Sequence, residues 1–258
     1  MNSDLAHRTA LVTGATAGIG RATALALAER GADVIVHGRD AERAAGTVAR
    51  ITALGGTARF EPADLSDPAD VTRLAERAGD VDILVNNAGI FRFARTADTD
   101  QATFDAHVDV NLRAPYLLVQ ALTPGMAQRG RGAIVSISSG AATTPGTGTG
   151  IYGATKAALE SLTRVWAAEF GPAGVRVNAV AAGPTRTEGT AAYGDAFEAA
   201  GKSVALQRLA SADEIAAAVV FLCSEAAGYV NGHTLAALGG MPALGQGSPD
   251  GRSPAGTA

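Results

Sequence analysis

Short runs of β-branched and other apolar residues alternate with longer alanine-rich stretches through most of the chain. Most of these runs are continuously apolar instead of alternating with polar residues, which is typical of strands buried on both faces of a sheet. The alanine-rich stretches have the length and composition of helices. Strand and helix in regular alternation indicate right-handed crossovers. We therefore expect an α/β fold, a doubly wound parallel sheet of about seven strands with helices on both faces.

The strand-like runs occupy residues 9–13, 34–37, 57–60, 82–86, 133–137, 175–180 and 234–237, and the helix-like stretches occupy 18–30, 41–54, 68–78, 102–128 and 152–170. Pro115 lies inside the longest expected helix and predicts a kink or local irregularity, because proline cannot donate a backbone hydrogen bond. No linker divides the chain, so we expect one domain over residues 1–244. The tail, residues 245–258, is rich in glycine, serine and proline and is expected to be mobile.

The composition fits a single large domain: 258 residues, of which 47% are hydrophobic and 18% charged. A net charge of −4 offers no basic face for nucleic acid. The one cysteine, Cys223, lies in an apolar run and is expected to be a buried, inert thiol. His7, His37, His107 and His233 are scattered without ligand spacing, so no metal site is expected.

The first residues lack the charged and apolar segments of a signal peptide. No uninterrupted apolar stretch approaches the roughly 18 residues that a membrane-spanning helix needs. We therefore expect a cytoplasmic protein that does not enter a membrane.

Tyr152 and Lys156 carry the first sign of chemistry. On a helix, residues four apart project from one face with about 6 Å between them. A nearby ammonium favours the phenolate, and an acid that works near neutral pH needs a pKa about three units below the ordinary tyrosine value of about 10. That shift is about 4 kcal/mol of preferential phenolate stabilisation. The pair indicates an enzyme.

A glycine-rich turn lies between the first strand and the first helix, with glycines at 14, 18 and 20. Glycines in such a turn let the backbone approach a pyrophosphate, whose charge is stabilised at the helix N-terminus. The spacing is Gly-x-x-x-Gly-x-Gly, not the commoner Gly-x-Gly-x-x-Gly. Taken alone, the turn could also be only a tight connection.

Four motifs in this order resemble the short-chain dehydrogenase/reductase family: the glycine turn, Asn86-Asn87-Ala88-Gly89, Ser139, and Tyr152-x-x-x-Lys156. The resemblance covers about residues 9–240 and is closest to the 3-oxoacyl-(acyl carrier protein) reductases. It implies a Rossmann-type domain, over residues 1–244, that both binds a dinucleotide and catalyses the reaction. Cofactor and substrate would meet at the carboxyl ends of the strands.

The resemblance implies a catalytic set of Asn111, Ser139, Tyr152 and Lys156. Tyr152 would protonate a carbonyl oxygen as hydride arrives, or take the alcohol proton in reverse. Ser139 would hydrogen-bond the same oxygen, Lys156 would lower the tyrosine pKa and hold the nicotinamide ribose, and Asn111 would steady a water next to Lys156. Alternatively Ser138 takes the serine role, or Asn111 is a local helix kink. Cofactor contacts are implied for Gly14, Thr16, Gly18, Ile19, Gly20, Arg39, Asp64, Leu65, Asn87, Ala88, Gly89, Tyr152, Lys156, Gly183, Thr185 and Thr187.

The end of the second strand bears on the choice of cofactor. Gly38 stands where a carboxylate would select NAD(H), and the guanidinium of Arg39 suits a 2′-phosphate, so the sequence favours NADP(H) over NAD(H). Against this, Asp40 could pair with Arg39 or cap the next helix, and Ala17 replaces a basic residue common in NADP-using relatives. Asp64 could likewise be a turn or N-cap residue instead of an adenine contact.

Two positions depart from the family pattern. The usual Pro-Gly after the sixth strand is Ala182-Gly183, which puts the geometry of that loop in doubt. The usual aspartate near the C-terminus is Leu238, which suggests an altered strand end or subunit contact. Neither change falls in the catalytic set.

The expected substrate is a small molecule, a medium-sized and partly apolar carbonyl compound or secondary alcohol, with Phe91, Phe93, Tyr193 and Phe197 available to line its pocket. A 3-oxoacyl-thioester reductase, for which Arg129 and Arg131 could meet an acidic carrier, is one alternative. A nucleotide-sensing regulator without turnover is another. Apolar residues on the catalytic helix, Val165, Trp166, Ala167 and Phe170, favour a homodimer or homotetramer.

Overall fold

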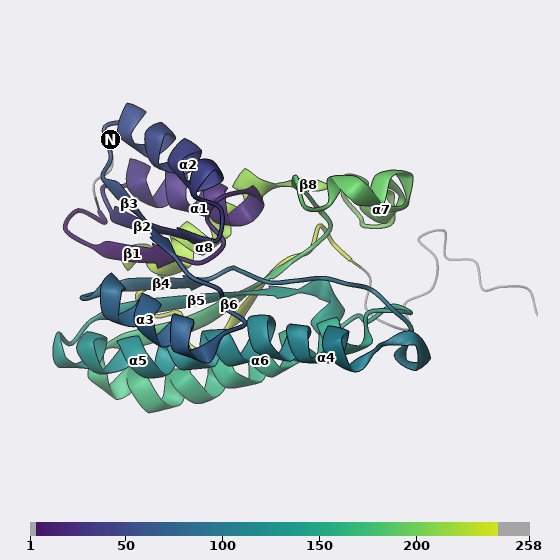
Figure 1. Ribbon diagram of the computed structural model, residues 1–258. Coiled ribbons are helices and arrows are strands. Elements are labelled where there is room, and N and C mark those ends of the chain that lie inside the picture. The colour runs from purple at the N-terminus through teal and green to yellow at the C-terminus, as the bar shows by residue number, and fades with distance from the viewer. Residues whose placement is uncertain (1–3, 242–258) are drawn as a thin grey trace, which may run out of the picture.

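A computed structural model describes residues 4–241, and its centre is a seven-stranded, all-parallel sheet with the strand order β3-β2-β1-β4-β5-β6-β9 (Figure 1). This arrangement confirms the doubly wound α/β fold. The strands are β1 (Thr9–Val12), β2 (Asp33–Gly38), β3 (Ala58–Pro62), β4 (Ile83–Asn86), β5 (Gly132–Ser139), β6 (Val175–Ala182) and β9 (Thr234–Ala237). A separate pair, β7 (Thr185–Arg186) and β8 (Ala210–Ser211), lies beyond the main sheet.

Helices cover both faces of the sheet. One face is covered by α1 (Gly18–Glu29), α2 (Ala41–Ala53) and α8 (Ala212–Cys223), and the other by α3 (Pro68–Ala78), α5 (Ala114–Gln128) and α6 (Gly150–Phe170). Two shorter helices, α4 (Gln101–Val108) and α7 (Gly194–Lys202), lie at the end of the molecule where the strands finish (Figure 1).

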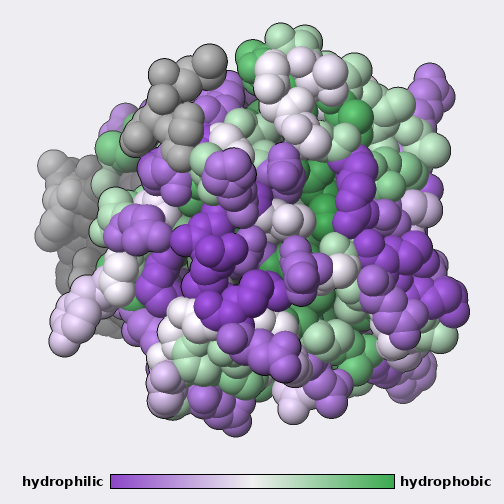
Figure 2. All heavy atoms as spheres, turned by 90° about the vertical axis from the view of Figure 1, so that its left-hand side faces the viewer, coloured by the Kyte–Doolittle hydropathy of each residue, from purple (hydrophilic) through white to green (hydrophobic). Residues whose placement is uncertain are grey.

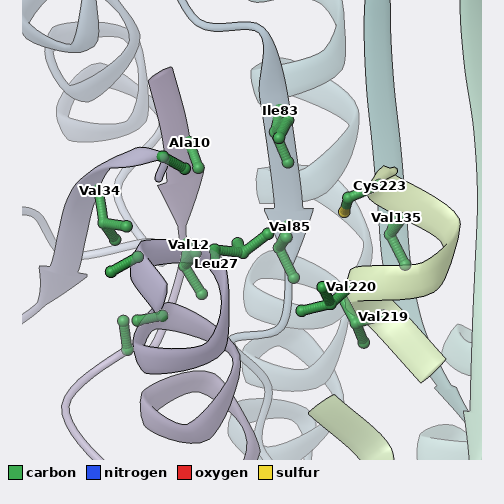
Figure 3. Close-up of a cluster of buried hydrophobic side chains, with 14 of the residues drawn as sticks. Ala10, Val12, Leu27, Val34, Ile83, Val85, Val135, Val219, Val220 and Cys223 are labelled. Atoms are coloured by element: carbon green, nitrogen blue, oxygen red, sulfur yellow. The ribbon is translucent and has the colours of Figure 1, made fainter. Parts of the chain in front are cut away.

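Successive residues of the central strands are buried on opposite faces. Val12 and Val85 pack with α1 and α8, whereas Leu11 and Leu84 pack with α3 and α5. This is why the strands appear in the sequence as continuous apolar runs. Figure 3 shows the cluster that contains Val12 and Val85, in which Cys223 lies among aliphatic side chains. Burial raises the pKa of the Cys223 thiol to about 12, in keeping with an inert thiol.

The long helix expected over residues 102–128 is divided. It consists of α4, a π-helical turn over Asp109–Arg113, and α5. Pro115 lacks the N–H that would bond the carbonyl of Asn111, so the regular ladder cannot continue there. The expected irregularity is confirmed, but it precedes Pro115 and contains Asn111.

Figure 2 views the edge where the strands begin, and hydrophilic side chains dominate its centre. A hollow of about 580 Å³ on this edge is lined in part by arginines and acids that pair with each other, as Arg8 with Glu225 and Arg131 with Asp82. None of the helices within residues 4–241 has both the length and the apolar character to cross a membrane. The tail over residues 245–258 lies outside the described residues.

Candidate active site

The glycine turn between β1 and α1 is built by close approach of backbone to backbone. A Cβ added to Gly20 would lie 2.3 Å from the carbonyl oxygen of Gly14, so no side chain fits there. Gly18 has φ +52°, in the left-handed region that favours glycine, and faces the side chain of Thr187 at 3.1 Å from an added Cβ. The turn therefore requires glycine and exposes the first N–H groups of α1.

The second motif braces this turn. Asn87 donates from Nδ2 to the carbonyl oxygens of Thr13 (2.8 Å) and Gly14 (3.2 Å). The Thr13 hydroxyl in turn accepts from the backbone N–H groups of Asn87 and Ala88, both at 3.0 Å. Asn87 and Ala88 thus lie beside the glycine turn and fix its shape, and their contact with a cofactor stays a prediction.

His37 is a supporting residue that the sequence analysis treats as an isolated histidine. Its Nδ1 accepts from the N–H of Gly14 at 3.1 Å, and its Nε2 lies 3.2 Å from the carbonyl oxygen of Ala63. The neutral ring with its proton on Nε2 satisfies both contacts. Burial lowers the pKa of His37 to about 4, so the ring is neutral near pH 7.

At the end of β2, Asp40 caps α2 by accepting from the N–H of Arg43 at 3.0 Å. Arg39 is exposed and forms no ion pair with any carboxylate in residues 4–241. Of the two possibilities for Asp40, the structure shows the helix cap and not the pair with Arg39. The guanidinium of Arg39 is therefore available to an anionic ligand.

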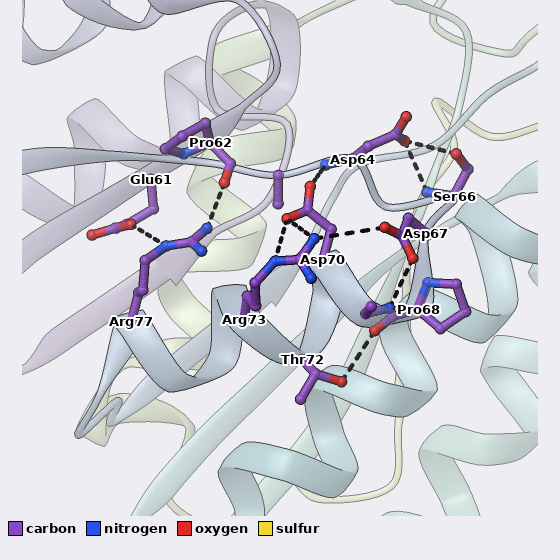
Figure 4. Close-up of polar contacts among 12 residues, drawn as sticks. Glu61, Pro62, Asp64, Ser66, Asp67, Pro68, Asp70, Thr72, Arg73 and Arg77 are labelled. Atoms are coloured by element: carbon purple, nitrogen blue, oxygen red, sulfur yellow. Dashed lines mark hydrogen bonds and ion pairs between the residues drawn. The ribbon is translucent and has the colours of Figure 1, made fainter.

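Asp64 follows β3 in a network of acids and arginines (Figure 4). Its Oδ1 accepts from the backbone N–H and hydroxyl of Ser66, at 2.9 and 2.8 Å, and these bonds lower its pKa. Asp67, not Asp64, caps α3. Leu65 is buried in the core. The structure thus shows Asp64 as a turn residue, and its role as an adenine contact stays a prediction.

Ser139, at the end of β5, is the serine that reaches Tyr152. A hydrogen bond joins the two side chains. Ser138 is 1% exposed, and its hydroxyl donates to Glu160 at 2.6 Å, on the turn of α6 after Lys156. The alternating direction of strand residues separates the two serines: Ser139 faces Tyr152, and Ser138 joins β5 to α6 through Glu160.

The pKa of Tyr152 differs from the expectation. Burial raises it, and the hydrogen bond with Ser139 only partly offsets this effect. Lys156 lies over the tyrosine ring, with Nζ 5.9 Å from the ring centroid, and Nζ donates to the carbonyl oxygen of Ile137 at 2.8 Å. Burial also lowers the pKa of Lys156 to about 8. Lys156 and Tyr152 are therefore neighbours, and the lowering of the tyrosine pKa by Lys156 stays a prediction.

Asn111 sits in the π-helical turn and is fully buried. Its Oδ1 accepts from the N–H of Ile90 at 2.8 Å, and its Nδ2 donates to the carbonyl oxygen of Ile90 at 2.9 Å. A Cβ on Gly89 would lie 3.2 Å from Asn111 Oδ1 and 3.4 Å from Lys156 Nζ. Asn111, Gly89 and Lys156 are therefore neighbours, and the Asn111 amide joins the segment after β4 to α6 because its Nδ2 also donates to the hydroxyl of Thr155 at 3.3 Å.

The loop after β6 closes the other side of the site. β6 continues through Ala182, and Gly183 donates to the carbonyl oxygen of Ala237 at 2.9 Å. Leu238 packs against this loop, 3.0 Å from an added Cβ on Gly183. The Thr185 hydroxyl donates to the carbonyl oxygen of Gly183 at 2.8 Å. The loop is ordered by backbone pairing with β9, without the family's proline.

Glu188, two residues after β7, lies on the glycine turn. Its Oε2 accepts from the N–H of Gly18 at 3.0 Å, and its other oxygen pairs with Arg21. Burial alone would raise the pKa of Glu188, but its hydrogen bonds, including those from Arg21 and Gly18, hold it below the ordinary value. The N-terminus of α1 thus takes an anion in this structure.

The chain was compared with known families, sequences and structures. Residues 14–242 match the profile of a family described as Enoyl-(Acyl carrier protein) reductase. D-threitol dehydrogenase from Mycolicibacterium smegmatis is 38% identical over 90% of this chain and 92% of its own length.

Solved structures are also similar to this chain. A short chain dehydrogenase/reductase family protein is 51% identical, with a TM-score of 0.87 and coverage of 92% of this chain and 98% of its own. A short chain dehydrogenase from Burkholderia cenocepacia, crystallised in complex with NADP, is 41% identical, with a TM-score of 0.85 and coverage of 92% and 99%.

Proposed function

This chain belongs to the short-chain dehydrogenase/reductase family of oxidoreductases, and on that premise we propose that it transfers a hydride between NADP(H) and a carbonyl compound or secondary alcohol. The observation that carries the proposal is the placement of Tyr152, Ser139 and Lys156 at the carboxyl edge of the sheet, next to the glycine turn. In an open α/β sheet this edge is where a dinucleotide and its substrate meet.

The residues present fit a dinucleotide. A Cβ at Gly20 would clash with the backbone of Gly14, and the first N–H of α1, that of Gly18, already donates to the carboxylate of Glu188. NADPH, when bound, supplies the hydride for the carbonyl carbon. Gly18, Ile19 and Thr187 would hold its phosphates, Asn87 and Ala88 would support the turn beneath them, and Lys156 would reach its ribose.

Tyr152 is proposed as the general acid. Its hydroxyl would give a proton to the carbonyl oxygen, which Ser139 would hold by a hydrogen bond, and the product is the secondary alcohol. Burial raises the pKa of Tyr152, which keeps the hydroxyl protonated but makes it a weaker acid, so proton donation near neutral pH needs the opposing effect of a cation, for which Lys156 is the candidate. The reverse reaction needs the phenolate, and a cationic Lys156 next to the cofactor would favour it.

Arg39 supports NADP(H) over NAD(H). The guanidinium is exposed and forms no ion pair in the described chain, and the acid next to it in sequence, Asp40, caps α2. A 2′-phosphate at this position would gain a charge-assisted contact. The neighbours crystallised with NADP are consistent with this choice.

The thioester reductase is the second candidate because one structural neighbour carries the name 3-oxoacyl (acyl-carrier-protein) reductase. The surface arginines Arg129 and Arg131 give the thioester reductase little support. Arg129 pairs with Asp80 at 2.6 Å and Arg131 with Asp82 at 3.2 Å, so both are already neutralised. A regulator without turnover has no use for the buried pair Tyr152 and Lys156, and nothing in the site favours it.

The test is a fluorescence titration of the protein with NADPH and NADH. We expect NADPH to bind at least about tenfold more tightly, and Arg39→Ala to remove most of the difference, since one charge-assisted contact is worth about that much. Arg164→Ala removes an exposed charge on α6, on the other face of the sheet from α2, and is the matched control. Equal or tighter binding of NADH would overturn the NADP(H) assignment. If neither nucleotide bound, the proposal that the protein is a dehydrogenase or reductase would be overturned.

A further inference from the structure

Four aromatic side chains from two segments far apart in the sequence gather next to the reacting tyrosine. Phe91 and Phe93 follow β4, Tyr193 ends the short helix Ala191–Tyr193, and Phe197 lies in α7. The ring centroids are 5.8 Å apart for Phe93 and Tyr193, 6.0 Å for Phe91 and Tyr193, and 6.3 Å for Tyr193 and Phe197. These four side chains are called the aromatic wall below.

The wall reaches Tyr152 directly. The ring of Phe93 meets the ring of Tyr152 edge-on, with centroids 5.7 Å apart and an interplanar angle of 79°. On another side of Tyr152 lies the buried ring of His107, 6.4 Å away. His107 Nε2 accepts from the N–H of Arg92 at 3.3 Å, which anchors the segment that carries Phe93.

The two halves of the wall are joined. The Tyr193 hydroxyl donates to the carbonyl oxygen of Phe91 at 2.9 Å, so its proton is already used within the protein. Gly189 packs on the ring of Phe91, because an added Cβ would lie 3.3 Å from its Cζ. The segment after β4 also bonds the loop after β5, from the N–H of Ala94 to the carbonyl oxygen of Gly148 at 3.0 Å.

Part of the wall remains open to a ligand. Phe93 is 46% exposed and Tyr193 37% exposed, which is apolar surface beside a reacting group. Aromatic rings attract a flat ring in offset or edge-on geometry beyond what simple burial gives. The wall contributes no carboxylate or amide, and the hydroxyl of Tyr193 is occupied, so it offers little to a polyhydroxylated ligand.

We infer that the substrate is a ketone with an aromatic ring attached to the carbonyl carbon, or the corresponding secondary alcohol, and that Phe93 and Tyr193 select it. The inference rests on the proposed function. The aromatic ring of the substrate lies against Phe93 and Tyr193, and the carbonyl oxygen reaches Tyr152. The carbonyl carbon takes the hydride of NADPH and the oxygen takes a proton, which gives the secondary alcohol and NADP⁺.

The experiment compares kcat/KM, with NADPH, for acetophenone, cyclohexyl methyl ketone and erythrulose. The ratio of acetophenone to cyclohexyl methyl ketone isolates the aromatic ring at nearly constant size. Phe93→Leu keeps an apolar side chain without a ring, and we expect it to lower this ratio about three- to tenfold, the range of one aromatic contact. Tyr193→Phe keeps the ring and should preserve the ratio. Phe104→Leu changes a phenylalanine of α4 that is 45% exposed and takes no part in these ring contacts, so it is the matched control.

An unchanged ratio in Phe93→Leu, or a parent enzyme that reduces erythrulose better than both other ketones, would overturn the inference and leave the proposed function standing. A protein that binds NADPH but reduces none of the three ketones would overturn the proposed substrate class together with the inference.

Discussion

Burial affects the protonation of two catalytic candidates in a way that a motif does not reveal. Tyr152 and Lys156 are both shielded from water, and shielding disfavours the charged form of each. The spacing of the two residues predicts their proximity, which the structure bears out with Nζ 5.9 Å from the tyrosine ring. The spacing could not predict that Lys156 Nζ donates to the carbonyl oxygen of Ile137, because Ile137 lies in β5 and contacts Lys156 only in the folded chain.

His37 makes folding stability depend on pH. In the folded protein its pKa is about 4, and in the unfolded chain about 6.5. Between these values the unfolded state binds a proton that the folded state does not, so stability is full above pH 6.5 and falls as the pH drops toward 4. The loss is about 3 kcal/mol when complete. Urea unfolding from pH 4 to 7 measures it.

The variant that isolates this effect is His37→Gln, which keeps hydrogen-bonding groups but does not titrate. We expect its stability to fall less steeply than that of the parent between pH 6.5 and pH 4. His233→Gln, at an exposed histidine, controls for the loss of one imidazole. Parallel pH curves for His37→Gln and the parent would contradict the assignment of the buried neutral ring.

At the scale of elements, the loop after β7 contacts the glycine turn through the side chain of Glu188. Glu188 places a carboxylate at the N-terminus of α1, where the cofactor phosphates are proposed to lie. Like charges repel there, so Glu188→Gln is expected to tighten NADPH binding about threefold at low salt. The effect should shrink as salt rises, because the Glu188 side chain is 50% exposed.

Fluorescence titration at two salt concentrations measures this change. Glu225→Gln, which also removes an acid paired with an arginine but at the opposite edge of the sheet, is the matched control. Weaker NADPH binding by Glu188→Gln would show that the carboxylate supports the cofactor site and does not compete with it.

Most regular elements could be predicted because their signal is local. The strands of the main sheet match the apolar runs to within two residues, whereas β7 and β8 match no expected run. α3 begins and ends where expected, since Pro68 opens it and Gly79 follows it. α8 was missed as a helix, although Ser211 and Glu214 form a capping box that its sequence shows. α7 was missed because its glycine- and alanine-rich sequence carries little pattern.

Supporting contacts were harder to predict because their partners are distant in sequence. His37 bonds Gly14 and Glu188 bonds Gly18, and no spacing rule connects such pairs. The four-motif resemblance located the candidate site, and the structure brings Ser139, Tyr152, Lys156 and Asn111 together there. Their catalytic roles stay predictions.

At the scale of the whole molecule, an apolar surface on α5 and α6 bears on assembly. Trp166 and Ala167 are buried within the chain, so the sequence argument overcounted them, but Tyr116 and Val165 are 48% and 47% exposed. A hollow of about 280 Å³ next to Trp166 is lined by both helices. This surface supports the proposed homodimer or homotetramer.

Analytical ultracentrifugation at micromolar concentration tests the assembly. We expect the parent to sediment as a dimer or tetramer, and Tyr116→Glu to sediment as a smaller species, because an unpaired charge in an apolar contact is costly. Tyr229→Glu, at a fully exposed tyrosine by the hollow on the opposite edge, should sediment as the parent does. A parent that is only monomeric would refute the proposal.

The central claim is that Tyr152 exchanges the proton that accompanies hydride transfer. The most direct measurement is NADPH-dependent carbonyl reduction by Tyr152→Phe, with NADPH binding measured on the same sample. The account predicts that turnover falls by about 10²-fold or more while the dissociation constant for NADPH changes little. A variant that reduces carbonyls as fast as the parent would contradict it.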